Sequence, residues 1–393
     1  MFAENGKISK QEMRSLLVLG WIGKQSLLFP ILLKSLYGWE KTAALLLSLV
    51  WIVLFISLLK KVRKKREASM PKAHMYLIGI PFFFYLLSNE LYLIRVTARV
   101  SAVCILPETG ETALCLLLLF AAWMAEVGDA QKRGRAAQAL YPVVLIALLT
   151  LMIAALWGIQ PTYLWKALNG NTEDAVKMLP PTWSAGAVAD LIQTSPALAK
   201  GIAVTGASLL LAASFAEMEL LLFENMYIDC RTMRGSVLRV MGSMCLLTIL
   251  MIGSFGATPL NRLEWPVPVL MSSVKLPGDF LQRWDVIFLA ILLFGLFTAI
   301  SSGLHGLHRI AGELLPRHLM RLRRPEAAGI LVLLCLIAVG EYEQAEWLYL
   351  KLTLCIIVPV MTAVLLIIWG MRTGNEKETH TKTEIQDTGE ADR

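Results

Sequence analysis

Hydrophobic residues run along this chain in long uninterrupted blocks, separated by short polar stretches. A helix needs ~20 apolar residues to cross ~30 Å of hydrocarbon, and ten blocks approach or exceed that length. Because no block alternates polar and apolar residues as a membrane β-strand does, we expect helices rather than a barrel. The predicted spans cover residues 13–34, 38–59, 75–104, 111–128, 138–157, 200–228, 236–256, 284–305, 328–341 and 347–371.

The predicted fold class is therefore an all-α polytopic membrane protein with one transmembrane domain, residues 1–372. Ten helices divide into five and five, which permits an inverted repeat of residues 8–157 and 200–371. The polar stretch 158–199 is the predicted outer loop between the halves, and two short interfacial helices are expected within it. The polar segment 373–393 has no apolar periodicity and is predicted to be a disordered cytoplasmic tail.

Composition agrees with this class. Of 393 residues, 56% are hydrophobic and only 17% are charged, and the mean hydropathy is +0.60. These values exclude a soluble enzyme, a disordered protein and a disulfide scaffold. The formal net charge of +7 indicates loops that face anionic membrane lipid rather than nucleic acid.

Basic residues predict the orientation. With the N-terminus in the cytoplasm, 25 of the 37 Lys and Arg residues fall in inner segments and eight in outer loops. Cytoplasmic loops carry the excess of Lys and Arg. We therefore expect both termini and residues 60–72 inside, residues 158–199 and 257–283 outside, and an even number of spans.

Spans one and six carry polar and small residues in their middle, at corresponding places of the two halves. Such residues are what unwound backbone lining a cavity requires, so we predict that both helices are broken and enclose a ligand pocket. In an inverted repeat the two breaks face each other. We therefore expect Lys24 and Glu217 to approach within salt-bridge or single-water distance, with Glu219 as the fallback partner of Lys24. The predicted ligand-binding residues are Gly20, Gly23, Lys24, Gln25, Ser26, Ser214, Phe215, Glu217 and Glu219.

Four stretches in this order resemble one known family. They are IGKQSLLFP, ARVSAVCILPETGETAL, SFAEMELLLFENMYI and EWPVPVLMSSVKLPGDFLQRWDVIFL. Together they resemble the GerAB-type spore germination permeases, the B subunits of nutrient germinant receptors within the amino acid–polyamine–organocation transporter superfamily. The resemblance implies ten transmembrane helices, the inner membrane of a spore, and assembly with a larger A-type subunit and a lipoprotein C-type subunit. It also implies a pocket for a small germinant, commonly an amino acid, at the two helix breaks.

The sequence departs from that family at two positions. Lys24 stands where the family has small residues, and Glu217 stands where it usually has Gly. Both changes predict a smaller and more polar pocket.

A second polar group lies in spans three and eight. Arg95 and Arg99 are four residues apart, so they share a helix face that cannot meet lipid. A structural ion-pair network with a carboxylate of another helix is one interpretation, and a direct anion contact is the other. Glu90 of the same span belongs to this possible polar network. Ser301 and Ser302 correspond to hydroxyls that serve a cation site in sodium-coupled relatives, but small-residue packing explains them equally well.

Three functions stay open. The chain is predicted to be a receptor subunit that senses a germinant, a secondary transporter of amino acids or related solutes, or a scaffold with a degenerate pocket. No P-loop or nucleophile elbow is present, and His305 and His308 have no third ligand nearby in the sequence. We therefore predict no enzymatic activity, no metal and no cofactor.

Overall fold

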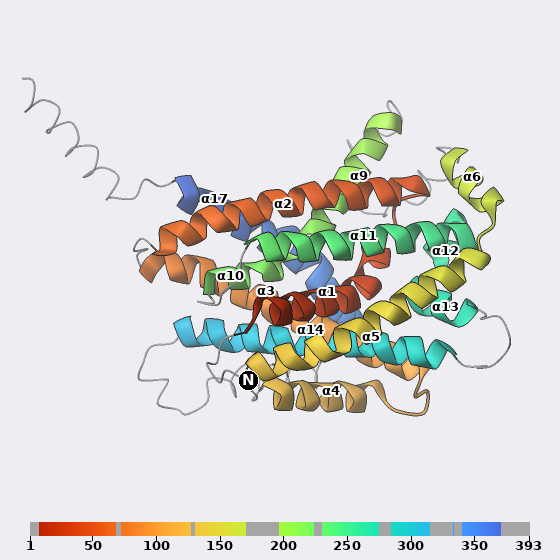
Figure 1. Ribbon diagram of the computed structural model, residues 1–393. Helices are drawn as coiled ribbons and strands as arrows, with labels where there is room; N and C mark the ends of the chain where they lie inside the picture. Colours follow the sequence, from red (N-terminus) through yellow and green to blue (C-terminus); the bar gives the residue numbers. More distant parts are fainter. Residues whose placement is uncertain are drawn as a thin grey trace, which may run out of the picture.

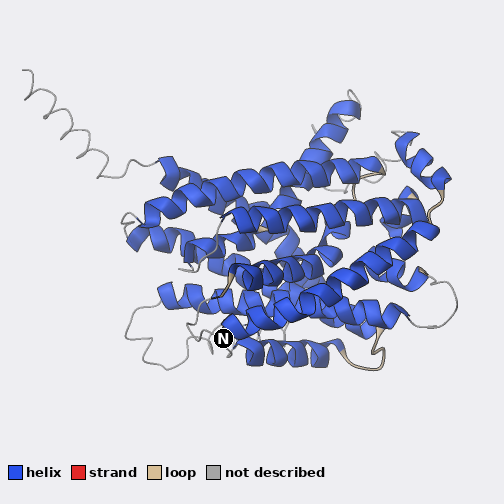
Figure 2. Ribbon diagram, in the orientation of Figure 1, coloured by secondary structure: helices blue, strands red, loops and turns tan. Residues whose placement is uncertain are grey.

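The computed structural model describes residues 8–67, 72–126, 130–169, 196–223, 230–274, 284–314, 333 and 340–370. Every regular element within these ranges is a helix (Figure 2). Most of the predicted ninth span, the two short helices predicted in the outer loop and the C-terminal tail lie outside the described residues. The count of ten helices and the inverted repeat therefore stay predictions.

Long helices run roughly parallel or antiparallel through the molecule (Figure 1). Seven helical segments in the described ranges are long and apolar enough to cross a membrane. The helices of the first half are α1 (Lys10–Leu32), α2 (Trp39–Glu67), α3 (Lys72–Cys104), α4 (Glu111–Glu126) and α5 (Ala130–Trp157), and α6 (Pro161–Asn169) lies in the predicted outer loop. Those of the second half are α9 (Pro196–Ala213), η2 (Ala216–Glu219), α10 (Leu220–Phe223), α11 (Cys230–Phe255), α12 (Ala257–Arg262), α13 (Pro266–Ser273), α14 (Trp284–Leu314), α16 (Tyr342–Trp347), η4 (Leu348–Ile357) and α17 (Val358–Gly370).

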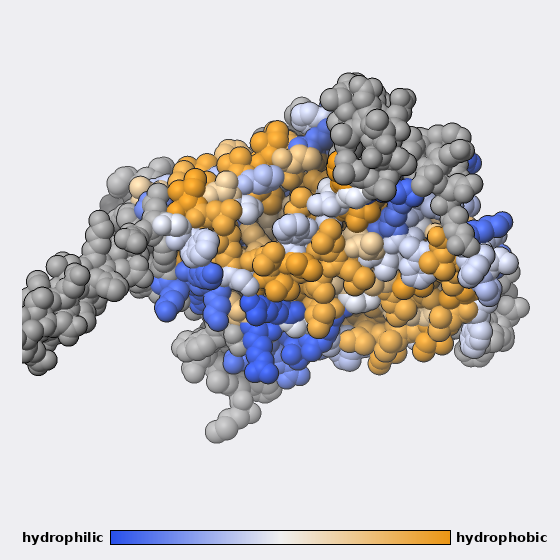
Figure 3. Space-filling view, turned by 90° about the horizontal axis from the view of Figure 1, so that it is seen from above, coloured by the Kyte–Doolittle hydropathy of each residue, from blue (hydrophilic) through white to orange (hydrophobic). Residues whose placement is uncertain are grey.

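Large apolar side chains cover the outside of this bundle. Leu54 of α2 and Ile146 and Ile153 of α5 are each more than half exposed. Apolar residues also cover much of the face seen in Figure 3. A soluble protein buries such residues, whereas a membrane protein turns them towards lipid. The chain is therefore an integral membrane protein, as its sequence predicts.

Helix α1 is continuous, so the predicted break in span one is wrong. Its glycines serve close packing instead. A Cβ atom added to Gly23 would lie 2.4 Å from the carbonyl carbon of Gly295 in α14, and one added to Gly20 would meet the backbone of Ala299 at 3.4 Å. Small residues let two membrane helices approach closely, and here they fix α1 against α14 while the helix stays intact.

The predicted break in span six is confirmed. Helix α9 ends at Ala213, a turn covers Ser214 and Phe215, and the 3₁₀ helix η2 leads into α10. The hydroxyl of Ser214 donates to the carbonyl oxygen of Leu211 at 2.6 Å. Serine side chains that bond nearby backbone groups compete with helix continuation, which accounts for part of the break.

The last predicted span contains a feature that its apolar pattern did not reveal. Between α16 and α17 the helix widens into the π-helix η4. Its Thr353 hydroxyl donates to Ser88 Oγ of α3 at 2.7 Å, and its Tyr349 ring stacks on Tyr92 of α3 with centroids 4.8 Å apart. A π-helix often marks a functional site, and this one adjoins the site described next.

Candidate functional site

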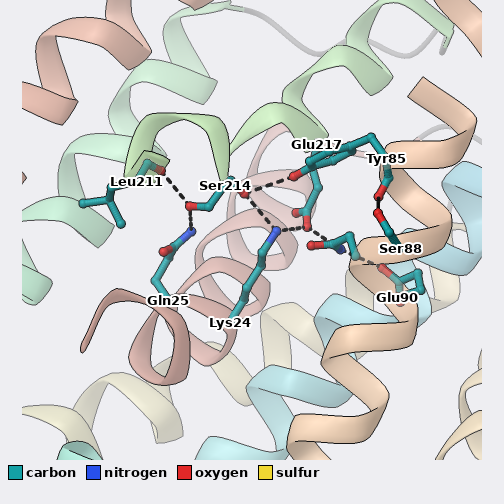
Figure 4. Close-up of polar contacts among 9 residues, drawn as sticks. Lys24, Gln25, Tyr85, Ser88, Glu90, Leu211, Ser214 and Glu217 are labelled. Carbon is teal, nitrogen blue, oxygen red and sulfur yellow. Dashed lines mark hydrogen bonds and ion pairs between the residues drawn. The ribbon is translucent and has the colours of Figure 1, made fainter. Parts of the chain in front are cut away.

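Lys24 projects from α1 towards the break in span six (Figure 4). Its side chain is fully buried, and Nζ lies 2.5 Å from Glu217 Oε1. Nζ also donates to the carbonyl oxygen of Ser214 at 2.8 Å. The predicted approach of Lys24 to Glu217 is thereby confirmed as a direct ion pair.

Two more bonds join the break to its neighbours. Gln25 Nε2 donates to Ser214 Oγ at 2.9 Å, and the hydroxyl of Tyr85 in α3 donates to the Ser214 carbonyl at 3.2 Å. Ser214 thus receives donors from both α1 and α3. The turn left by the helix break is held by side chains of other helices.

Helix α3 supplies an amide and a second carboxyl group. Asn89 Nδ2 donates to Glu217 Oε1 at 3.0 Å and to Glu90 Oε1 at 3.1 Å. The fully buried Glu90 side chain lies against Gly303 of α14, where a Cβ atom would fall 1.7 Å from Oε1. We call the group formed by Lys24, Gln25, Asn89, Glu90, Ser214 and Glu217 the polar centre.

Aromatic rings form one wall of the polar centre. Lys24 Nζ lies 5.9 Å from the ring centroid of Tyr85 and 5.8 Å from that of Tyr349. An ammonium group within about 6 Å of a ring centroid is attracted to the ring quadrupole. The rings of Tyr85 and Tyr349 therefore help to stabilise the buried ammonium group of Lys24, whose charge Glu217 neutralises.

Glu219 lies beside the polar centre in sequence but forms no comparable contact with the described residues. It is fully buried, and neither carboxyl oxygen has a hydrogen-bond partner in that part of the chain. A buried carboxyl group without a partner is costly. Glu219 is thus a buried acid with no hydrogen-bond partner among the described residues, whereas Glu217 is paired with Lys24.

Four other predicted site residues have structural contacts. Ser26 Oγ donates to the Ile22 carbonyl at 2.6 Å, and Phe215 packs edge-on against Trp21 with centroids 5.5 Å apart. Gly20 packs on α14, as does Gly23. A role of these residues in ligand binding stays a prediction.

The two arginines of the second predicted polar group contact different parts of the described chain. Arg95 bonds the Gly340 carbonyl. Arg99 Nε lies 3.5 Å from Glu264 Oε1, and its guanidinium lies over the Tyr342 ring. Glu90 bonds Asn89 of the polar centre, and the pairing of Arg99 with Glu264, which lies outside α3, agrees with the ion-pair interpretation. A network that joins Glu90 to both arginines stays a prediction.

Ser301 and Ser302 bond their own helix. Both hydroxyls donate to the Thr298 carbonyl, at 3.2 and 2.8 Å. This pattern is typical of serines that pack within a membrane helix.

Sequence reasoning missed Tyr85, Asn89 and Tyr349 as members or neighbours of the site. Tyr85 and Asn89 are four residues apart and therefore share one face of α3. This spacing of four residues was the sequence signal that could have placed both side chains at the site. Tyr349 gave no such signal, because its position depends on the π-helix.

The chain was compared with protein-family models, with curated proteins and with solved structures. Residues 187–339 match the family model described as spore germination protein. Over this segment the predicted resemblance to spore germination permeases is confirmed.

The matched segment includes the helix break with Ser214 and Glu217. No curated protein matches the chain. Among solved structures, the manganese transporter of Eremococcus coleocola bound to an aromatic bis-isothiourea compound has a TM-score of 0.40 and 12% identity, over 91% of this chain and 76% of that one. A variant of the same transporter with one histidine replaced by alanine gives 0.36 and 12%, over 91% and 73%.

Proposed function

We propose that this chain is the membrane subunit of a nutrient germinant receptor and senses a small germinant at the polar centre. The observation that supports it best is the Lys24–Glu217 ion pair at the break in span six. Charged side chains inside membrane-spanning helices are costly and usually mark a functional site. A helix break beside them exposes backbone groups that bind ligands in many membrane proteins.

The chemistry of the polar centre fits a zwitterion such as an amino acid. A ligand carboxylate would pair with Lys24, and a ligand ammonium group would pair with Glu217. Each buried charge would then exchange one opposite partner for another, so neither is left unpaired. Binding of this kind separates α1 from η2, which supplies the conformational signal.

In this role the signal passes to partner subunits. The family resemblance favours A-type and C-type receptor subunits as those partners, in the inner membrane of a spore. Deletion of this chain should then lower the amount of the A-type subunit. Normal levels and localisation of both partners in its absence would contradict the proposal.

Two other functions use the same geometry. A transporter would open the polar centre alternately to each side of the membrane. A scaffold would keep the ion pair closed and bind nothing. The scaffold would fit the complete burial of the Lys24 side chain against Glu217.

One set of measurements separates the three functions. The purified full chain is placed in nanodiscs and in proteoliposomes and given each standard L-amino acid in isotope-labelled form. Saturable binding without accumulation supports the sensor, and accumulation inside the vesicles supports the transporter. Absence of both binding and accumulation, with normal receptor assembly, supports the scaffold.

A pair of variants tests whether binding depends on Lys24. Lys24→Gln should abolish binding, while Lys200→Gln, at a more exposed ion pair with Glu40, should leave it unchanged.

A further inference from the structure

A large groove lies between α2, α9 and the last span. It has a volume of about 1450 Å³. We call it the α2–α9–α17 groove. Its walls include Trp51, Leu54 and Leu58 of α2, Ala207 of α9, Leu354 of η4 and Leu366 of α17.

The size and the lining of the α2–α9–α17 groove do not fit an amino acid, the kind of ligand proposed for the polar centre. Pockets for small molecules usually measure about 300–1,000 Å³ and contain several polar groups that fix orientation. This groove is larger, and apolar side chains and small residues form most of its walls. Such a lining fits long hydrocarbon chains.

Three cations line the same groove. Lys34 follows α1, Arg262 ends α12 and Lys351 lies near the start of η4. All three side chains are exposed, and within the described part of the chain none has an ion-pair partner. Lys and Arg next to a membrane attract anionic headgroups. The groove therefore combines apolar walls with a positive rim.

The groove also reaches the helix break. Ala212, Ala213 and Ala216 line it, and these three alanines flank Ser214 and Glu217 of the polar centre. Their short side chains let a bound hydrocarbon chain lie against the backbone of the break. Occupancy of the groove therefore bears directly on the segment that carries Glu217.

We propose that the α2–α9–α17 groove binds an anionic phospholipid. The headgroup phosphate lies between Lys34, Arg262 and Lys351, and an acyl chain follows the alanines of α9 to the break. A transmembrane helix of a partner fits the rim less well, because it would need acidic residues at its own end to match three cations. The inference does not depend on the proposed function, since it uses neither Lys24 nor Glu217.

Native mass spectrometry of the full chain tests this proposal, with phosphatidylglycerol and phosphatidylcholine as probes. We expect phosphatidylglycerol to bind preferentially and to raise the melting temperature. Each of Lys34→Gln, Arg262→Gln and Lys351→Gln should weaken its binding about fivefold. Lys166→Gln, an exposed cation of α6 outside the groove, should have no effect.

A second pair of variants tests the location. Ala203→Phe places a ring in the groove and should abolish the lipid adduct, whereas Ala139→Phe, on the exposed face of α5, should leave it intact. Equal binding of both lipids, no effect of the three charge variants, or retention of the adduct in Ala203→Phe would overturn the proposal. So would cross-linking that places a protein segment in the groove instead of lipid.

Discussion

Lys24 Nζ of α1 and Glu217 Oε1 of η2 lie 2.5 Å apart, although 193 positions separate them in the sequence. Lys24 is fully buried, while 17% of the Glu217 side chain is exposed. The pair joins a continuous helix to a broken one. In the proposed function, it is the contact through which the polar centre would respond to a ligand.

Removal of one member should leave the other as a buried charge. We expect Lys24→Gln to lower the free energy of unfolding by ~3–5 kcal/mol if the site is dry, and by less if water reaches Glu217. Lys200→Gln breaks a more exposed pair with Glu40 and should cost less than ~1 kcal/mol. Unfolding in mixed micelles measures both values. Equal losses in the two variants would show that burial adds nothing at Lys24.

Substitution of Glu219 should change the stability of the protein in the opposite direction to substitution of Glu217. Because neither oxygen of its carboxyl group has a hydrogen-bond partner among the described residues, Glu219→Met removes a polar group that is costly to bury. We expect a melting temperature equal to or above that of the parent chain. Glu217→Met should lower it, because Lys24 and Asn89 each lose a partner. A large loss of stability in Glu219→Met would mean that this carboxyl group is satisfied.

The contact between α1 and α14 predicts a third result. Gly23→Ala forces a methyl group to within 2.4 Å of the Gly295 backbone and should cost ~1–3 kcal/mol of stability through overpacking. Gly242→Ala in α11 has nothing within 4 Å of the added methyl group and should stabilise its helix by up to ~1 kcal/mol. A tolerated Gly23→Ala would contradict the close approach of these helices.

Orientation in the membrane is a separate prediction from the distribution of basic residues. In a variant without native cysteines, Lys166→Cys should react with an impermeant thiol reagent added from outside. Lys60→Cys should react only after the membrane is opened. The reverse pattern would invert the predicted topology, and reaction of both from outside would contradict a cytoplasmic 60–72 segment.

Hydropathy predicted the positions of most described spans because the membrane requires each helix to be long and apolar. The predicted third span, 75–104, lies within α3 and shares its end. The Lys24–Glu217 pair was also predictable, since two opposite charges in facing helices each need a partner. The continuity of α1 was not predictable in the same way. A Gly-x-x-Gly pattern permits either unwinding or close packing, and only Gly295 on the facing helix decides between them.

The π-helix η4 escaped prediction for a related reason. Its sequence is an ordinary apolar run, and its widened turn brings Thr353 to Ser88 and Tyr349 to Tyr92. Those partners lie far away along the chain, 265 positions in the case of Thr353 and Ser88, so no local pattern reveals them. The part of the site that Tyr349 forms therefore depends on tertiary contacts.

A charge-swap cycle at positions 24 and 217 tests the central claim most directly. Lys24→Glu and Glu217→Lys each place two like charges together and should each lower the free energy of unfolding and the germination response. The double swap restores opposite charges, so it should recover part of both losses and give a coupling free energy above the ~0.5 kcal/mol expected of independent sites. A double variant no better than the sum of the single ones would contradict the ion pair as the link between α1 and the helix break.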